Sequence, residues 1–325
     1  MAILQQEAPT IFARRVNKEK TFICSTSFTK KFVHETLGWS YRKVTRAAQK
    51  IPEDAAELCQ ASICRQALAI RNHSIPAACR INIDQTQVVI AGGNDYTYET
   101  IGSSQVSAVG HEEKRAFTVV VGIAASGDVL PFQVVWKGMT SAVLPKATTP
   151  HRRQADEIGI QWVPSGTRTY WSTFETMCSY VNDIVAPYSN DQKERLGLPQ
   201  DQECILQLDV WSVHRGKEFV DWITKTHPSI IRDYVPGGCT GIFQPCDVGI
   251  QKLFKAAVRC RQHEDIIEET LQQLKQGIAP DRLRLDTQLG TLRDRSVRWL
   301  VEAYNAINKP EIVLKVSQPI NREED

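Results

Sequence analysis

An apolar run with one carboxylate at its centre restricts the fold of this chain more than any other stretch. Residues 81–90 read INIDQTQVVI, with Pro76 before the run and Gly92-Gly93 after it. The β-branched residues on both sides of Asp84 are typical of a strand that is buried on both faces of a sheet. A carboxylate in such a strand has to be paired or bind a cation, because burial of an isolated charge is costly. Asp84 is therefore expected to belong to a polar site.

Two further acids follow apolar or turn segments downstream. Asp209 ends the apolar strand predicted from Cys204, ahead of a polar turn that leads into a helix. Asp247 follows Pro245, close to the first turn of a long amphipathic helix. A fold can bring a strand carboxylate, a strand-end carboxylate and a helix-start carboxylate together at one edge of a sheet.

Three clustered carboxylates are suited to hard divalent cations. Mg²⁺ prefers oxygen ligands and keeps several waters, so that a few carboxylates can hold two ions. Two ions can stabilise the attacking and the leaving oxygen of an in-line phosphoryl displacement. The pattern therefore favours a nuclease or strand-transfer site that uses two Mg²⁺ or Mn²⁺ ions.

Four blocks of sequence carry a resemblance to a known family. They are Asn82-Ile83-Asp84-Gln85-Thr86, Glu113–Thr118 leading to Ala125–Pro131, Leu208-Asp209 with His214, and Gln244-Pro245-Cys246-Asp247-Val248-Gly249. Together they resemble the DDE superfamily endonucleases of pogo-like transposases over roughly residues 20–315, and the last block is the most specific.

The resemblance implies a ribonuclease H-like core, DNA as the partner and a homodimer. It also implies that Asp84, Asp209 and Asp247 form the metal-binding and catalytic triad. Val210 stands where many relatives have Asn directly after the second Asp. For His214 two interpretations remain open: it orders the attacking water or contacts the scissile phosphate, or it is a histidine of the turn.

The apolar periodicity, taken independently, predicts the same fold class. Strands are expected at 81–90, 115–124, 129–137, 204–209 and 230–235, and helices at 174–188, 216–226, 247–276 and 286–307. The order predicts an α/β fold, with a ribonuclease H-like mixed five-stranded sheet flanked by helices and a small N-terminal helical segment. The predicted units are a basic helical segment over 1–50, a helical connector over 51–78, the catalytic domain over 79–280, and a C-terminal helix and tail over 281–325.

The N-terminal segment is basic and the remainder acidic. Residues 14–50 carry +8, whereas residues 51–325 carry −5. A helix is predicted from Ser25 to the break at Gly38, and a second, basic helix over Tyr41–Gln49. Two interpretations remain open: a truncated helix-turn-helix remnant that contacts DNA, or a solvated helix pair packed on the core.

The segment 140–173 is predicted to be mostly loop. It contains four candidate phosphate-contacting side chains, which are Lys146, His151, Arg152 and Arg153.

The composition argues against a disulfide-stabilised protein and against a membrane-spanning one. The nine cysteines form no CxxC pair, which favours reduced thiols over a disulfide framework, although Cys239 and Cys246 with His214 are an alternative zinc set. No apolar run reaches the roughly 18 residues of a membrane span. We expect a soluble intracellular protein with no membrane contact, located in the nucleus.

These observations predict Mg²⁺-dependent DNA strand cleavage and transfer. An alternative is a domesticated, transposase-derived DNA-binding or chromatin protein without cleavage activity. A third option is a ribonuclease H-like nuclease that acts on RNA-containing hybrids.

Overall fold

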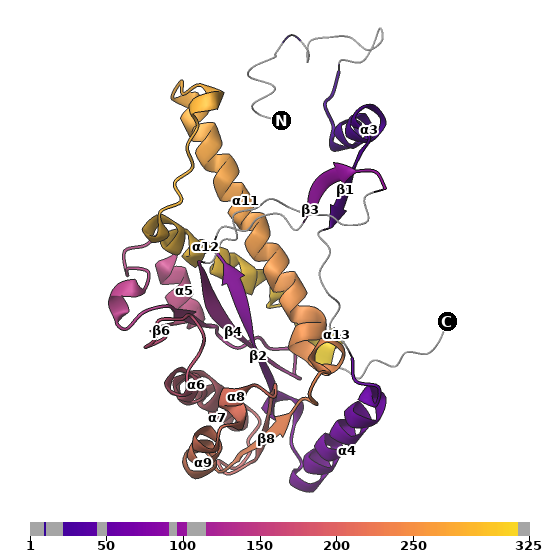
Figure 1. Ribbon diagram of the computed structural model, residues 1–325. Helices are drawn as coiled ribbons and strands as arrows, with labels where there is room; N and C mark the ends of the chain where they lie inside the picture. The colour runs from indigo at the N-terminus through magenta and orange to yellow at the C-terminus, as the bar shows by residue number, and fades with distance from the viewer. Residues whose placement is uncertain (1–9, 11–21, 44–50, 91–95, 103–114, 318–325) are drawn as a thin grey trace. The chain divides into compact units, whose positions relative to one another are not determined.

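The computed structural model describes residues 10, 22–43, 51–90, 96–102 and 115–317 of the chain. The chain divides into two compact units (Figure 1). The first comprises residues 1–49, 92–113 and 264–286, and the second comprises residues 50–91, 114–263 and 287–325.

In the first unit, the helix predicted from Ser25 is confirmed as α3 (Thr26–Leu37). The Ser25 hydroxyl accepts a hydrogen bond from the Phe28 backbone N–H at 3.1 Å, and Gly38 ends the helix at φ 65°. The prediction of a helix from Tyr41 is wrong for the described residues, because β1 (Trp39–Lys43) pairs antiparallel with β3 (Tyr96–Thr100). Residues 44–49 of that predicted helix lie outside the described part. A strand pairing across more than fifty residues is invisible to local periodicity.

The second unit contains a six-stranded sheet in the order β6-β5-β4-β2-β7-β8. Its strands are β2 (Arg80–Val89), β4 (Ala116–Ala124), β5 (Gln133–Trp136), β6 (Gln161–Pro164), β7 (Cys204–Leu208) and β8 (Ile230–Tyr234). β4 runs antiparallel to β2 and β5, whereas β7 runs parallel to β2 and β8 parallel to β7. The five predicted strands are therefore confirmed in the ribonuclease H-like order, and β6 extends the sheet beyond β5.

Helices cover both faces of this sheet (Figure 1). The helices of the second unit are α4 (Ala55–His73), α5 (Arg152–Ile158), α6 (Phe174–Tyr180), α7 (Ala186–Arg195), α8 (Ser212–Arg215), α9 (Lys217–Thr226), α10 (Thr240–Phe243), α12 (Leu289–Ile307) and α13 (Pro310–Ser317), together with the first half of α11 (Gln251–Lys275), whose residues from Glu264 on belong to the first unit. The second unit also contains the short turns η1 (Ala77–Cys79) and η2 (Ser141–Val143) and two five-residue π-helical turns, η3 (Val181–Val185) and η4 (Cys246–Ile250). The short turn η5 (Pro280–Arg282) belongs to the first unit.

The alternation along β2 divides the core into two layers. Ile81 and Ile83 pack with residues of α6, η3 and α9, including Tyr180 and Phe219. Val88 and Ile90 pack on the opposite face with residues of η4, α11 and α12. Since successive side chains of a strand alternate, Asn82 and Asp84 share the face that η4 and α11 cover. Burial on both faces, as predicted for this strand, is confirmed.

The segment predicted as mostly loop contains α5 and β6. β6 pairs in parallel with β5, in a register that places Gln133 opposite Gln161. The short strand has too few residues for a clear alternation, so only the partner strand reveals it. No helix among the described residues is long and apolar enough to cross a membrane.

Candidate active site

Asp84 lies in the middle of the sheet and is 6% exposed. Its Oδ1 accepts a hydrogen bond from the Gln85 backbone N–H at 2.8 Å, and its Oδ2 accepts one from the side-chain amide of Gln251 on α11. Gln251 is itself buried. Two neutral donors thus satisfy a carboxylate that the sheet removes from water.

Asp247 lies in the π-helical turn η4, which starts directly after Pro245 and leads into α11. The buried Gln244 amide donates to the Ile83 carbonyl on β2 at 3.1 Å, which attaches the start of this turn to the strand that carries Asp84. Single π-helical turns concentrate at functional sites, because the extra residue changes the direction of the side chains. The Gln-Pro-x-Asp-x-Gly block therefore builds a turn that is fastened to β2.

Asp209 follows β7, the strand next to β2. Its Oδ1 lies 2.6 Å from Nδ1 of His214 on α8. The other ring nitrogen, Nε2, lies 3.4 Å from the side-chain nitrogen of Gln85. Since an ionised carboxylate only accepts hydrogen bonds, Nδ1 carries the proton and Nε2 accepts from Gln85. Both ring nitrogens therefore have hydrogen-bond partners within the protein. This geometry favours a role for His214 in orienting Asp209 over direct contact with a scissile phosphate.

Asp84 interacts with both of the other acids. Burial raises the pKa of Asp84 well above its usual range, and the Asp247 carboxylate adds the second largest effect in that direction. The Gln85 backbone N–H opposes the rise, whereas Asp209 raises the pKa of Asp84 further. The closeness of the Asp247 carboxyl group therefore favours the protonated form of Asp84. Like charges that share a buried site produce this pattern. The structure therefore brings Asp84 and Asp247 together, with Asp209 close enough to Asp84 to interact with it electrostatically.

This set of groups fits a divalent cation chemically. Three carboxylates are the hard oxygen ligands that Mg²⁺ and Mn²⁺ prefer, and a cation would stabilise the charged form of the crowded pair. As the side chains stand, no three His, Cys, Asp or Glu residues within the described ranges are arranged to hold a metal ion. Asp84 is bonded to Gln251 and Asp209 to His214, so metal binding requires these carboxylates to exchange partners or to turn.

Cys246, one of the alternative zinc ligands, is completely buried beside the acids. Burial, followed by the charges of Asp84 and Asp247, raises the pKa of its thiol well above the ordinary value. The protonated Sγ lies 3.7 Å from the Asn82 carbonyl oxygen. Cys246 therefore behaves as a small buried donor.

Periodicity alone did not identify Gln251 or Gln244 as parts of this site. Both are buried amides, and the available signal was their position: Gln244 opens the most specific sequence block, and Gln251 lies four residues after Asp247, one helical turn away.

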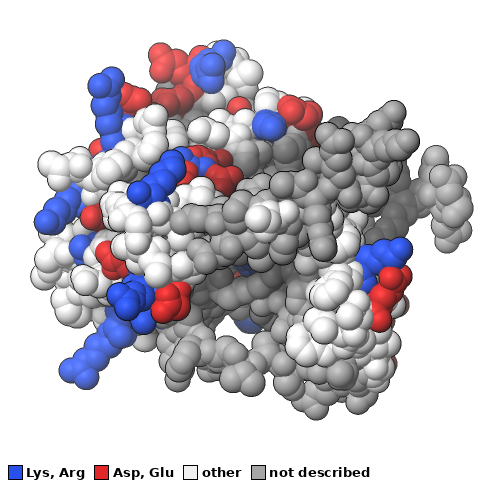
Figure 2. All heavy atoms as spheres, turned by 90° about the horizontal axis from the view of Figure 1, so that it is seen from above, with Lys and Arg blue, Asp and Glu red and all other residues white. Residues whose placement is uncertain are grey.

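Two of the candidate phosphate-contacting side chains in the segment 140–173, Arg152 and Arg153, differ in how accessible they are to a ligand in solvent. Arg152 is 19% exposed, bonds Asp156 and the Pro145 carbonyl, and lies 5.3 Å from the centre of the Trp162 ring. Arg153 is 91% exposed and pairs with Glu157. Figure 2 shows Lys and Arg interspersed with Asp and Glu on the described surface of one face. Arg152 is therefore largely engaged in packing, whereas Arg153 is open to solvent.

The strand order of this sheet, with acids on β2, directly after β7 and in η4, defines a ribonuclease H-like domain. Residues 114–314 match the DDE superfamily endonuclease family. Because the match covers more than half of the chain, the chain belongs to this family. The matched range includes Asp209, His214 and Asp247 and begins after Asp84.

Among solved structures, the chain is similar to the Mos1 mariner paired end complex with Mn, with 11% identity and a TM-score of 0.40 over 85% of this chain and 62% of that one. It is also similar to the Mos1 strand transfer complex, with 10% identity and a TM-score of 0.39 over 90% of this chain and 65% of that one. The chain thus spans less than two thirds of the length of both, and the likeness is distant. No curated protein matches the sequence.

Proposed function

We propose that this chain is the catalytic domain of a DNA-cleaving and strand-transferring enzyme of the pogo-like transposase type. The observation that carries the proposal is the buried Asp84 carboxyl, whose pKa is raised by burial, then by Asp247 and further by Asp209. Membership of the DDE superfamily endonucleases supports it. Crowded acids without a catalytic or binding role would be a persistent cost to folding.

In this proposal Asp84, Asp209 and Asp247 hold two Mg²⁺ or Mn²⁺ ions. Bound there, the ions would activate a water or a 3′-hydroxyl and stabilise the leaving oxygen. Asp84, the central strand residue, would contribute to both ions. His214 would hold the Asp209 carboxylate in one orientation through Nδ1, while Gln85 fixes the ring from the other side. DNA is the proposed substrate, a second copy of the chain the proposed partner, and the nucleus the proposed location.

The test is metal-dependent nicking of duplex DNA. Wild type, Asp84→Asn and the matched control Asp191→Asn, which changes an exposed Asp of α7, are compared in Mg²⁺, in Mn²⁺ and in chelator. We expect nicking by wild type and Asp191→Asn in either metal, and a loss of at least about 100-fold in Asp84→Asn. Equal nicking by wild type and Asp84→Asn would rule out the mechanism.

A variant with all three acids neutralised and an RNA–DNA hybrid substrate, added to this experiment, separate the alternatives. DNA binding that persists when all three acids are neutralised, with no cleavage in any metal, would identify a DNA-binding protein without nuclease activity. Preferential cleavage of an RNA–DNA hybrid over duplex DNA would identify the ribonuclease H-type activity instead.

A further inference from the structure

Asn82 is a buried amide in the sheet that no step of the proposed chemistry uses. It lies two residues before Asp84 on β2, is 6% exposed, and its side chain is on the same face as Asp84. A buried side-chain amide is costly unless its donor and acceptor are both satisfied. The partners of Asn82 therefore indicate what it stabilises.

Its oxygen is bonded to the turn that carries Asp247. Asn82 Oδ1 accepts a hydrogen bond from the backbone N–H of Cys246 at 3.0 Å. Cys246 directly precedes Asp247, and this N–H belongs to the first turn of η4, where backbone donors have no partner within the helix. The bond thus attaches the helix start that carries Asp247 to the strand that carries Asp84.

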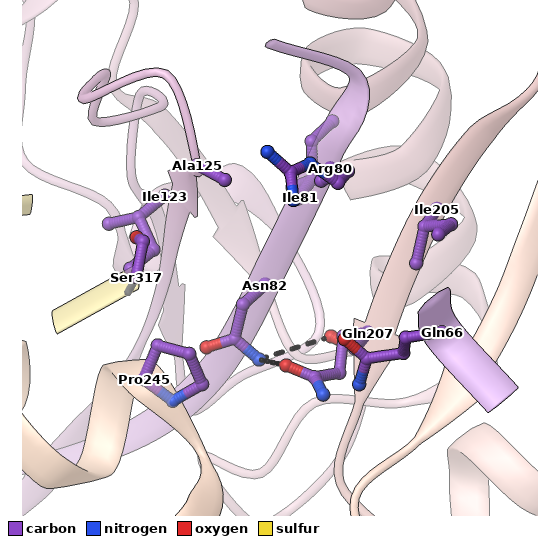
Figure 3. Close-up of a pocket in the computed structure, with 10 residues that line it drawn as sticks. All are labelled: Gln66, Arg80, Ile81, Asn82, Ile123, Ala125, Ile205, Gln207, Pro245 and Ser317. Carbon is purple, nitrogen blue, oxygen red and sulfur yellow. Dashed lines mark hydrogen bonds between the residues drawn. The ribbon is translucent and has the colours of Figure 1, made fainter. Parts of the chain in front are cut away.

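Its nitrogen is bonded to the strand that leads to Asp209. Asn82 Nδ2 donates to Gln207 Oε1 at 3.2 Å and lies 3.4 Å from the Gln207 carbonyl oxygen. Gln207 precedes Asp209 by two residues and lies opposite Asn82 in the parallel pairing of β2 and β7. Figure 3 shows the Asn82 side chain between Pro245 on one side and Gln207 on the other, with both bonds to Gln207 drawn.

Beyond Gln207 the hydrogen bonds continue across the sheet. Gln207 Nε2 lies 3.5 Å from Asp233 Oδ2 on β8, and the same oxygen accepts from the Gln66 amide of α4 at 2.7 Å. Arg65 donates to the other oxygen of Asp233 at 2.9 Å. Asp233, which Gln66 and Arg65 hold in place, thus orients the Nε2 of Gln207, so that the Oε1 of Gln207 is directed at Asn82.

We propose that Asn82 is the positioning residue of the acid cluster: one amide holds β2, β7 and η4 together at points one or two residues from Asp84, Asp209 and Asp247. The effect of Asn82 on metal-dependent DNA cleavage rests on the proposed function. The attachment of η4 and β7 to β2 through Asn82 rests on the hydrogen bonds alone. An amide suits this position because it donates and accepts at once, whereas a carboxylate would lack the donor and add a fourth negative charge.

The experiment compares Asn82→Leu, which keeps the approximate size and removes both bonds, with Gln133→Leu as a matched control. Gln133 is a fully buried amide of β5 that donates to Gln161 Oε1 and to the Thr176 carbonyl, at 2.7 and 2.9 Å, and contacts none of the acids. Two quantities are measured in the full chain: the Mn²⁺ concentration for half-maximal DNA nicking, and hydrogen exchange of the peptide that contains the Cys246 amide.

We expect Asn82→Leu to raise the half-maximal Mn²⁺ concentration about 10–100-fold and to accelerate exchange of the Cys246 amide. Gln133→Leu should lower the melting temperature without changing either quantity. If Asn82→Leu does not fold, Gln207→Met serves instead; it removes the Oε1 that accepts from Asn82, together with the Nε2 that faces Asp233, and should give a smaller shift in the same direction.

Two results would overturn the inference. One is an unchanged Mn²⁺ requirement in Asn82→Leu, and the other is unchanged protection of the Cys246 amide. If the wild type neither binds Mn²⁺ nor nicks DNA, the proposed function fails, and the exchange measurement then decides by itself whether Asn82 holds η4 on β2.

Discussion

Nδ1 of His214 lies 2.6 Å from Oδ1 of Asp209, on an imidazole side chain that is only 1% exposed. Asp209 itself is partly open, at 29% exposure, because it follows the end of β7. A buried ring that donates to a partly exposed carboxylate restricts the directions in which that carboxylate can bind a cation. His214 thereby holds the Asp209 carboxyl from the buried side of the site.

The first prediction concerns His214. We expect His214→Gln to lower metal-dependent nicking about 10–100-fold, mainly through a higher Mn²⁺ requirement, because Asp209 loses the group that orients it. His227→Gln is the matched control, since His227 bonds Asn182 and none of the acids. Mn²⁺ titrations of nicking rate, with thermal melts of both variants, provide the measurement. A loss of rate with an unchanged Mn²⁺ requirement would contradict the positioning role.

The second prediction concerns the stability of the metal-free protein. The pKa of Asp84 is raised in the folded state, by burial first and by Asp247 second, above the value of 3.8 for an unperturbed Asp. Between these two values the folded state binds more protons than the unfolded state, so that stability falls as pH rises through the folded pKa. Asp84→Asn removes this titration. The variant should therefore melt at a higher temperature than wild type at pH 7.5 in chelator.

Melting temperatures measured over a series of pH values control for effects of Asp84→Asn that are unrelated to the titration of Asp84. The difference in melting temperature between Asp84→Asn and wild type should shrink as the pH is lowered towards 4, where both side chains are neutral. Asp191→Asn should show no such trend. Added Mn²⁺ should stabilise the wild type and leave Asp84→Asn nearly unchanged. A difference that grows towards acidic pH would contradict the prediction.

The third prediction concerns Gly249, the last residue of the most specific sequence block. A Cβ at this position would overlap Cγ1 of Val316 on α13, so that only glycine allows the two segments to approach this closely. Gly249→Ala should cost about 1–3 kcal/mol of unfolding free energy, through overpacking. Val316→Ala in the same chain should recover part of the loss, which a double-mutant cycle in denaturant measures. Gly241→Ala is the control, because nothing lies within 4 Å of its added Cβ.

The fourth prediction separates the two neighbouring arginines of α5. Arg152→Gln should destabilise the protein by about 1–2 kcal/mol, because it loses the bond to Asp156 and the contact with the Trp162 ring. Arg153→Gln should leave the melting temperature unchanged. If Arg153 contacts phosphate, this variant should weaken DNA binding and reduce the salt slope by about one. Equal thermal losses in both variants would show that the exposed side chain has a structural role instead.

Much of the fold was predictable because the core strands are long and apolar. The β-branched runs around Asp84 and before Asp209 indicated buried strands, and their order along the chain indicated a ribonuclease H-like sheet. β1 and β6 were not predictable in this way. Each is a short strand whose hydrogen-bonding partner is distant or itself short, and local periodicity carries no information about a partner.

The sequence by itself determined which acids are candidates, since a carboxylate inside an apolar strand requires an explanation wherever the strand lies. Only the tertiary structure decided that Asp84 and Asp247 crowd each other, that Asp209 is held by His214, and that one amide at Asn82 joins the three segments. The reason is physical. Burial is encoded in the composition of each segment, whereas the pairing of polar groups depends on distances between segments that are far apart in the chain.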